Sequence, residues 1–246
     1  MSLDPWVWLG FFILLSYTVE AITGFGSLVI ALSLGALMLP INQMLPVVVP
    51  LNVLMTGYLV WHNRQYIYWP ILFKLILPLM LLGTLVGYGL RPWVGGSLLQ
   101  LLFGALVFWF ASRELWRIHR GIKAVPHTLM LSRALTFGAG ITHGLFASGG
   151  PLLVYSIAGI NLDKSRMRAT LLVVWLILNG CLSVLFLLDG TLFPSLPCLV
   201  VYLPLLVIGV LLGEYLHHRL DEQRFRRLIY GLLVITGALL MMKSVM

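Results

Sequence analysis

Residues 5–39 read PWVWLGFFILLSYTVEAITGFGSLVIALSLGALML. The one charged residue of this stretch is Glu20. A helix that crosses a membrane needs about 20 apolar residues, so the stretch is too long for one crossing and too short for two. Gly24 and Gly26 interrupt it near its middle. We therefore expect two half-helices that meet at a break inside a membrane, where non-helical backbone must be buried in protein or line a cavity.

The composition of the whole chain also indicates a membrane protein. Of its 246 residues, 60% are hydrophobic and 10% are charged, whereas soluble domains average about 45–50% and about 25%. Several runs of 20 or more residues contain no Asp, Glu, Lys or Arg, among them 21–61, 134–162, 169–188 and 190–213. This pattern predicts an all-α polytopic membrane protein and excludes a soluble globular domain. The net charge of +8 lies in short loops, so it reflects topology and not nucleic-acid binding.

Seven further apolar segments follow the first, divided by clusters of charge, Pro and Gly. One of them, 130–160, is again too long for one crossing, and Gly144 and Gly149-Gly150-Pro151 interrupt it. Pro151 suits the first position of a new helix. The other six segments have the length of single crossings: 43–61, 66–90, 94–116, 168–188, 195–217 and 226–244.

The distribution of Lys and Arg favours a hairpin for the second broken segment. If all eight segments cross the membrane, the 16 basic residues divide into eight on each side, without a positive-inside bias. If 130–160 enters and leaves on one side, the division becomes 14 to 2, and the loops 113–133, 163–168 and 217–227 are all cytoplasmic. We therefore predict six full spans, two hairpin-like segments and both termini in the periplasm.

A pattern of glycines predicts an internal repeat. Gly26 and Gly35 recur as Gly150 and Gly159; Gly83 and Gly87 recur as Gly209 and Gly213; and Gly104 recurs as Gly231. Repeat 1 is then 1–116, with the broken segment 5–39, and repeat 2 is 131–246, with the broken segment 131–160; residues 117–130 form a cytoplasmic linker. Each repeat is a broken, re-entrant hairpin plus three spans, so the two copies lie inverted in the membrane. Inverted repeats with broken helices are an architecture of secondary transporters.

The two breaks are the candidate site for a ligand. Glycines leave backbone N–H groups accessible, and the N-terminus of each half-helix carries partial positive charge, so two such ends can hold an anion at mid-membrane. Close helix packing is the alternative explanation for the glycines. Asn52 and Asn179, in the span after each break, can bind a ligand or cross-link helices. The predicted substrate-binding residues are Thr23, Gly24, Phe25, Gly26, Ser27, Asn52, Ser148, Gly149, Gly150, Pro151 and Asn179.

Ionisable residues near the breaks are candidates for coupling and entry. Glu20 and His143 occupy nearly equivalent positions before the two breaks, and either can carry a proton; satisfying a free backbone group is the alternative role. Arg166 and Arg168 are candidates for the cytoplasmic entrance, although loop arginines often only set topology. Within the spans, Trp109 and Trp175 are expected to be ordinary packing residues.

The sequence resembles the TauE/SafE sulfite exporter family over nearly its whole length. The resemblance is carried by Thr23-Gly24-Phe25-Gly26 after Glu20, and by Gly149-Gly150-Pro151 followed by residues 164–170 and then Asn179. It implies export of sulfite or a small organosulfur anion across the bacterial inner membrane. Ser27 and His143 depart from the pattern of many members, which leaves the substrate open.

Two other function classes remain as alternatives at this point. A passive anion channel or uniporter would need the same anion site without coupling. An intramembrane serine hydrolase would pair Ser148 with His143, four positions apart. Cys181 and Cys198 lack the spacing of metal ligands, and we expect no metal and no cofactor. The expected partners are a small anion, protons as a candidate second cargo, and the lipid bilayer; no residue pattern assigns an oligomeric state.

Overall fold

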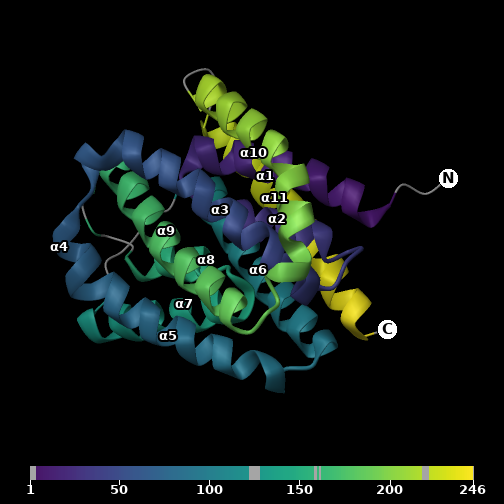
Figure 1. Cartoon of the computed structure of the whole chain (residues 1–246). Helices are drawn as coiled ribbons and strands as arrows, with labels where there is room; N and C mark the ends of the chain where they lie inside the picture. The colour runs from purple at the N-terminus through teal and green to yellow at the C-terminus, as the bar shows by residue number, and fades with distance from the viewer. Residues whose placement is uncertain (1–3, 122–127, 158–159, 161, 218–221, 246) are drawn as a thin grey trace.

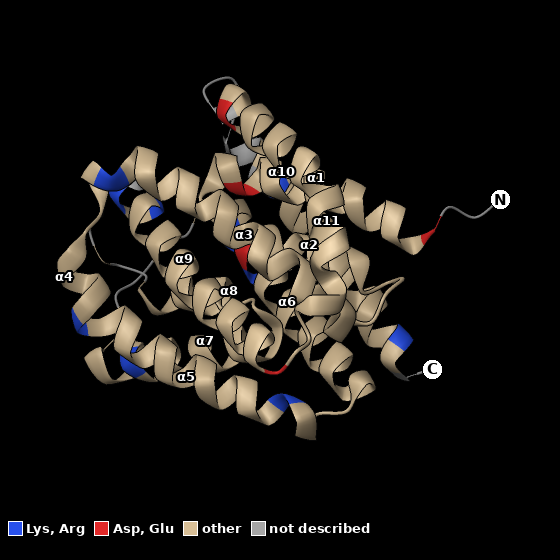
Figure 2. Cartoon of the chain, viewed as in Figure 1, with Lys and Arg blue, Asp and Glu red and all other residues tan. Residues whose placement is uncertain are grey.

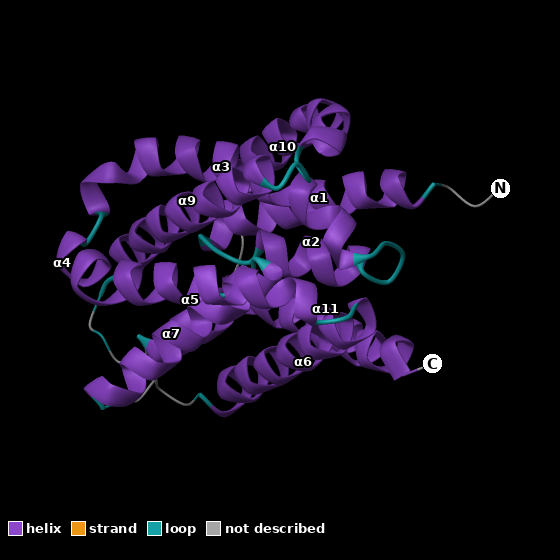
Figure 3. Cartoon of the chain, turned by 60° about the horizontal axis from the view of Figure 1, so that its bottom comes forward, coloured by secondary structure: helices purple, strands orange, loops and turns teal. Residues whose placement is uncertain are grey.

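The computed structural model describes residues 4–121, 128–157, 160, 162–217 and 222–245. Within these ranges the chain is helical, with short turns and no strand, as Figure 3 shows. The short helical elements between the long helices are η1 (Arg64–Tyr66), α4 (Trp69–Ile71), the π-helix η2 (Leu72–Ile76), η3 (Arg91–Trp93) and η4 (Phe193–Ser195). The predicted all-α class is confirmed.

Seven helices in the described residues are long and apolar enough to cross a membrane. Six of them correspond to the six predicted full spans, and the seventh is the first limb of the first broken segment. Figure 2 shows that their interiors are mostly uncharged and that blue segments gather near helix ends. The seven are Pro5–Thr23, Ile41–Tyr66, Trp69–Trp93, Gly96–Arg120, Ser165–Leu188, Phe193–Leu216 and Arg227–Ser244.

The first broken segment folds back on itself. It consists of α1 (Pro5–Thr23) and α2 (Ser27–Gly35). Gly35, at the end of α2, lies beside Leu9 in the first half of α1, where an added Cβ would be 3.2 Å from Leu9 Cδ1. The chain after α2 therefore returns toward the end of the molecule where α1 begins.

The second broken segment has the same folded-back geometry. It consists of α7 (Leu129–Phe146) and the short helix α8 (Gly150–Ser156). Ser132 Oγ, in the first turn of α7, donates to the carbonyl oxygen of Ser156 at 2.8 Å, and Thr136 Oγ1 lies 3.0 Å from Ser156 Oγ. These contacts hold the end of α8 against the start of α7. Both broken segments are thus hairpins in space, while the side of the membrane that each faces stays a prediction.

Each hairpin packs along a long helix from the other half of the chain. α7 lies along α5 (Leu77–Leu90), where a Cβ on Gly83 or Gly87 would overlap the α7 backbone around Gly140 and Gly144. α1 lies along α10 (Leu196–His217), where Gly209 and Gly213 approach the α1 backbone in the same way. Successive contacts advance in the same direction on both helices, so each pair runs parallel. Small residues are what lets membrane helices pack this closely.

The remaining long helices pair across the halves as antiparallel neighbours. α3 (Ile41–Asn63) packs on α9 (Lys164–Leu188), and α6 (Gly96–Arg120) packs on α11 (Glu222–Val245). The start of α1 and the end of α11 lie on the same side of the molecule in Figures 1 and 3. Exchanging the two halves preserves these pairings, as an inverted repeat would require, and the repeat itself stays a prediction. At the α6–α11 contact, Gly104 meets Gly237, whereas an added Cβ on Gly231 would meet no atom within 4 Å.

Candidate functional site

The first break is a turn that only glycine adopts easily. Gly24 ends α1 with φ +82°, and its N–H donates to the carbonyl oxygen of Glu20 at 2.7 Å. Gly26 precedes α2 with φ +103°. L-residues with a Cβ are disfavoured at such angles, so the two glycines allow α1 to stop and α2 to start within three residues.

A carboxylate of the chain itself occupies the N-terminus of α2. Ser27 N–H, the first of that helix, donates to Glu20 Oε2 at 3.0 Å. Asn52 Nδ2 lies 3.1 and 3.2 Å from the two Glu20 oxygens and 2.9 Å from Ser27 Oγ. All three residues are buried. Glu20 therefore stands where the partial positive charge at a helix N-terminus attracts an anion.

The second break is built from different residues. Ala147 ends α7 in the left-handed region, with φ +53°, and its N–H donates to the carbonyl oxygen of His143 at 2.6 Å. Gly149 is required by packing, since an added Cβ would overlap the Ala139 carbonyl oxygen. An added Cβ on Gly150 would lie 3.4 Å from Cζ2 of Trp175. Ala147 follows Gly24, and His143 follows Glu20, by the same 123 positions.

Asn52 and Asn179 join the two halves at the centre of the molecule. Asn179 Nδ2 donates to Asn52 Oδ1 at 2.6 Å, and both side chains are buried. Because α3 and α9 cross here, this bond links the residue that binds Glu20 to its counterpart in the other half. The two asparagines cross-link helices, as one of their two predicted roles requires, and they also line a cavity.

A small polar cavity lies where the two breaks meet. Its volume is about 20 Å³, which is room for about one water molecule. Five predicted binding residues line it together with Glu20, and the lining also includes Trp175. The residues that line it are Glu20, Gly26, Leu28, Val29, Asn52, Ala147, Ser148, Gly150, Trp175 and Asn179.

Three other predicted binding residues lie on an adjoining apolar cavity of about 30 Å³, whereas Gly24, Ser27 and Gly149 are on the lining of neither cavity. Thr23, Phe25 and Pro151 line it, with Gly26 shared between the two cavities, and α11 supplies Tyr230 and its neighbours. Thr23 Oγ1 donates to carbonyl oxygens of its own segment, at 2.9 Å to Val19 and 2.8 Å to Phe25. The structure therefore brings eight of the eleven predicted residues together in two neighbouring groups, one on the polar cavity and one on the apolar cavity.

The two candidate entrance arginines differ in where they lie. Arg168, in the first turns of α9, donates from Nη2 to the carbonyl oxygen of Ala21 at 2.5 Å, and its aliphatic part would overlap a Cβ on Gly24. It thus closes over the end of α1 at the first break. Arg166 pairs with Asp163, with Nε 3.3 Å from Oδ2, and both side chains are exposed.

The structure corrects the expectation for the two span tryptophans. Trp109 is 48% exposed on the outer surface, so it is not an interior packing residue. Trp175 is buried, but it lines the polar cavity and stacks on His143, with ring centroids 6.0 Å apart. A signal for Trp175 exists in the sequence, because it precedes Asn179 by four positions and therefore shares its helix face.

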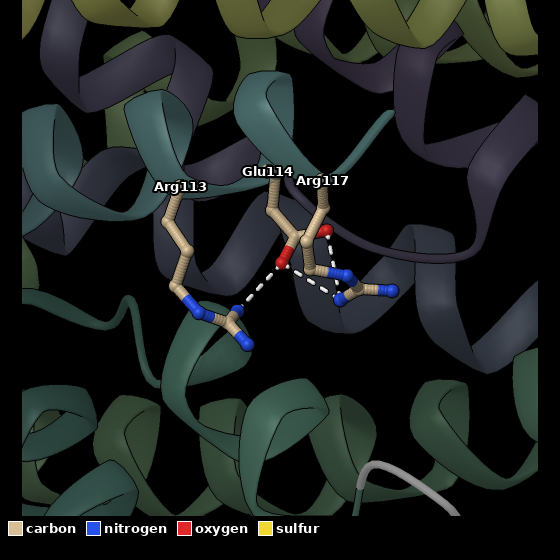
Figure 4. A network of polar contacts seen from close by, with 3 residues as sticks. All are labelled: Arg113, Glu114 and Arg117. Atoms are coloured by element: carbon tan, nitrogen blue, oxygen red, sulfur yellow. Dashed lines mark hydrogen bonds and ion pairs between the residues drawn. The ribbon is translucent and has the colours of Figure 1, made fainter. Parts of the chain in front are cut away.

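A charge cluster around the buried Glu114, near the end of α6, was also absent from the predicted sites. Glu114 Oε1 accepts from Arg113 Nη1 at 2.7 Å and from Arg117 Nη1 at 3.0 Å, as Figure 4 shows. The Arg113 guanidinium carbon also lies 3.9 Å from the centroid of the Tyr155 ring on α8. The cluster therefore ties the predicted cytoplasmic end of α6 to the second hairpin. Among the described residues, no group of three His, Cys, Asp or Glu side chains could hold a metal ion.

A family model identifies the class of this protein. The model described as "Sulfite exporter TauE/SafE" matches residues 9–240 of the 246. The chain belongs to this family. No curated protein and no solved structure matches it. Membership of the TauE/SafE family implies a membrane transporter that exports anions. In this chain, residues of the two breaks line a buried polar cavity.

Proposed function

We propose that this TauE/SafE member exports sulfite or a small organosulfur anion across the bacterial inner membrane, by alternating access around the polar cavity at the two breaks. The observation that carries the proposal is that residues of both breaks, with Asn52 and Asn179, line one buried cavity. Transporters with inverted repeats bind substrate at such a place, near the midplane and between discontinuous helices. The inner-membrane location follows from the family and belongs to the same proposal.

The size of the cavity favours a transporter over a permanently open channel. A space of about 20 Å³ holds about one water and no sulfite ion. The structure is thus closed around the site, and a substrate must enter a wider state. A passive anion channel or uniporter remains the alternative, and a uniporter shares this closed state.

The helix pairs suggest how the site opens. Because α1 packs on α10 and α7 packs on α5, each hairpin moves most easily together with its long partner from the other half. Rocking of these pairs about the central α3–α9 contact would widen the cavity on one side at a time. Arg168 donates a hydrogen bond to the end of α1 in the closed state. Opening of the cavity toward the cytoplasm would therefore break this bond.

Proton coupling is the preferred mechanism, with uniport as its competitor. Glu20 is a buried carboxylate at the site, and intramembrane ionisable residues are functional candidates by default. An anion that leaves a cell with an inside-negative potential already gains about 2.3 kcal/mol per charge per 100 mV, so export needs no proton to proceed. Glu20 and His143 are the residues whose substitution separates the two mechanisms.

The geometry at Ser148 does not favour hydrolysis. Ser148 Oγ donates to the carbonyl oxygen of Phe146 at 3.0 Å. The polar side chain beside the His143 ring is Asn179 and not Ser148, so a Ser–His pair is not formed among the described residues. A nucleophilic serine needs a base within hydrogen-bond reach.

Purified protein in liposomes tests the proposal. Vesicles that enclose a pH dye are offered sulfite, sulfoacetate, thiosulfate or taurine under an imposed potential, with protein-free vesicles as the control for permeation of neutral acids. We expect protein-dependent flux of at least one anion, with a dye response that is lost in Glu20→Gln and His143→Ala. If flux persists unchanged in both variants and no dye response occurs, proton coupling is excluded and uniport is the mechanism. Absence of protein-dependent flux for every anion would contradict export.

A further inference from the structure

The two sides of the polar cavity differ in how well their polar groups are paired. On the side formed by α1, α2 and α3, Glu20 accepts from Ser27 N–H and from Asn52 Nδ2, and Asn52 Oδ1 accepts from Asn179. The α2 N-terminus, which is the obvious place for an anion, already holds a carboxylate. A second anion on this side would lie directly against Glu20.

On the side formed by α7 and α9, polar atoms are less well paired. Trp175 Nε1 has no hydrogen-bond partner among the residues that the structure describes. The His143 ring and the Asn179 side chain lie against each other, without a well-formed hydrogen bond between them. The three residues are 6%, 0% and 1% exposed, so water does not solvate them from outside. Buried polar atoms are nearly always paired in folded proteins, and exceptions often mark a place where a ligand completes the bonding.

Trp175 is placed to contact a ligand in the cavity. Its six-membered ring lies over Gly150 at the second break, and its plane is inclined by 21° to the ring of His143 behind it. The indole N–H is a donor only, so its missing partner must be an acceptor. The oxygens of a sulfite or sulfonate group are acceptors, and a hydrogen bond to a charged acceptor is stronger than one to a neutral group.

The asymmetry follows from the sequence of the two halves. Where the first half has Glu20, the second has His143, which follows it by 123 positions. A carboxylate therefore lines the cavity from one half, while the imidazole ring of the other half lies behind Trp175. No Lys or Arg is among the described residues that line the cavity, so recognition has to come from uncharged donors and from this difference.

We infer that the substrate anion binds on the α7–α9 side of the cavity, where the Trp175 indole N–H donates to one of its oxygens and His143 supports the indole, while Glu20 excludes it from the α2 end. The inference rests on the proposed function, and it assigns Trp175 as a substrate-contacting residue for a small oxyanion. It also makes the two breaks chemically unequal: the first holds an internal anion, and the second holds the transported one.

Equilibrium binding of radiolabelled sulfite to purified protein in nanodiscs tests this inference. Trp175→Phe keeps an aromatic ring on Gly150 and His143 but removes the N–H. We expect the affinity for sulfite to fall about tenfold or more. Trp109→Phe, at an exposed position on the outer surface, is the matched control, and it should bind as the wild type does.

A second variant keeps the inference falsifiable if Trp175→Phe does not fold. Glu20→Gln preserves an acceptor for Ser27 N–H but removes the negative charge, so sulfite should bind about threefold tighter or more. Equal affinity of Trp175→Phe and wild type, or unchanged or weaker binding by Glu20→Gln, would overturn the inference. If the wild type itself binds neither sulfite nor a sulfonate, the proposed function fails instead, so the two failures are distinguishable.

Discussion

The contact between Asn52 and Asn179 is a direct hydrogen bond between polar side chains from both halves at the site. The Nδ2–Oδ1 distance is 2.6 Å, and both residues are buried. Through Asn52 this bond reaches the Glu20 carboxylate, and Asn179 stands on the same face of α9 as Trp175. A change at either asparagine therefore reaches both sides of the cavity.

Asn179→Ala should destabilise the protein by about 1–3 kcal/mol, because it leaves Asn52 Oδ1 buried without a donor. Thermal unfolding in detergent measures the change. Asn63→Ala is the control, since the Asn63 amide bonds only to the Leu59 carbonyl oxygen of its own helix. In a cycle with Asn52→Ala, we expect a coupling energy of about 0.5–3 kcal/mol. Strict additivity would show that the two side chains do not depend on each other.

At the scale of helices, glycines set how closely the hairpins approach their partners. Gly83 and Gly87 bring α5 against α7, and Gly209 and Gly213 bring α10 against α1. These four glycines are explained by packing, whereas Gly24 and Gly26 at the first break are explained by positive φ. The two kinds of glycine look alike in the sequence.

Gly87→Val should lower stability, because its Cβ would overlap the Ile141 carbonyl oxygen. Overpacking of this kind costs about 1–3 kcal/mol, and more when backbone cannot move. Gly89→Val in the same helix is the matched control, since an added Cβ there meets no atom within 4 Å. Equal melting temperatures for the two variants would show that α5 and α7 do not approach as closely as described.

A polar cluster at the end of a span connects α5 to the loop after α9. Tyr88 Oη donates to Asp189 Oδ2, and Thr191 N–H donates to Asp189 Oδ1 at 2.9 Å. Although partial burial acts to raise the pKa of Asp189, hydrogen bonds from Thr191 and Tyr88 and the charge of Arg91 hold it below its ordinary value. A lowered pKa means that the folded state favours the carboxylate.

Asp189 should therefore contribute stability at neutral pH that is lost on acidification. The contribution is complete above the ordinary carboxyl pKa and disappears as the pH falls through the lowered one. Asp189→Asn should reduce stability at pH 7 by about 0.2–1 kcal/mol, since the carboxyl is exposed. The difference from wild type should vanish in strong acid. A difference that stays constant in melting curves from pH 7 to pH 2 would contradict this role.

At the scale of the whole molecule, the sequence predicts the spans well and the site only in part. Apolar runs have the length of the helices they form, so the six full spans were predictable. The break at Ala147 has a left-handed alanine, which no propensity predicts. Glu20 binds the α2 N-terminus and Trp175 lines the cavity. Both placements depend on tertiary packing, which cannot be read from a single sequence.

The predicted topology can be measured by cysteine labelling in cells. In a background with Cys181→Ser and Cys198→Ser, single cysteines replace Arg120, Arg166 or Trp93, all exposed side chains. An impermeant reagent should label the Trp93 position from the periplasm and leave the Arg120 and Arg166 positions unlabelled until the membrane is opened. Labelling of positions 120 and 166 from opposite sides would remove the second hairpin from the topology.

The space between the two breaks is the proposed binding site of the transported anion, and Gly150→Val alters that space. The added methyl groups would push the Trp175 ring, 3.4 Å from a Cβ at this position, into a cavity of about 20 Å³. Gly231→Val is the matched control, because a Cβ there meets no atom within 4 Å. Sulfite flux into liposomes should be abolished in Gly150→Val and retained in Gly231→Val, with both proteins monodisperse. Wild-type flux through well-folded Gly150→Val would contradict the account.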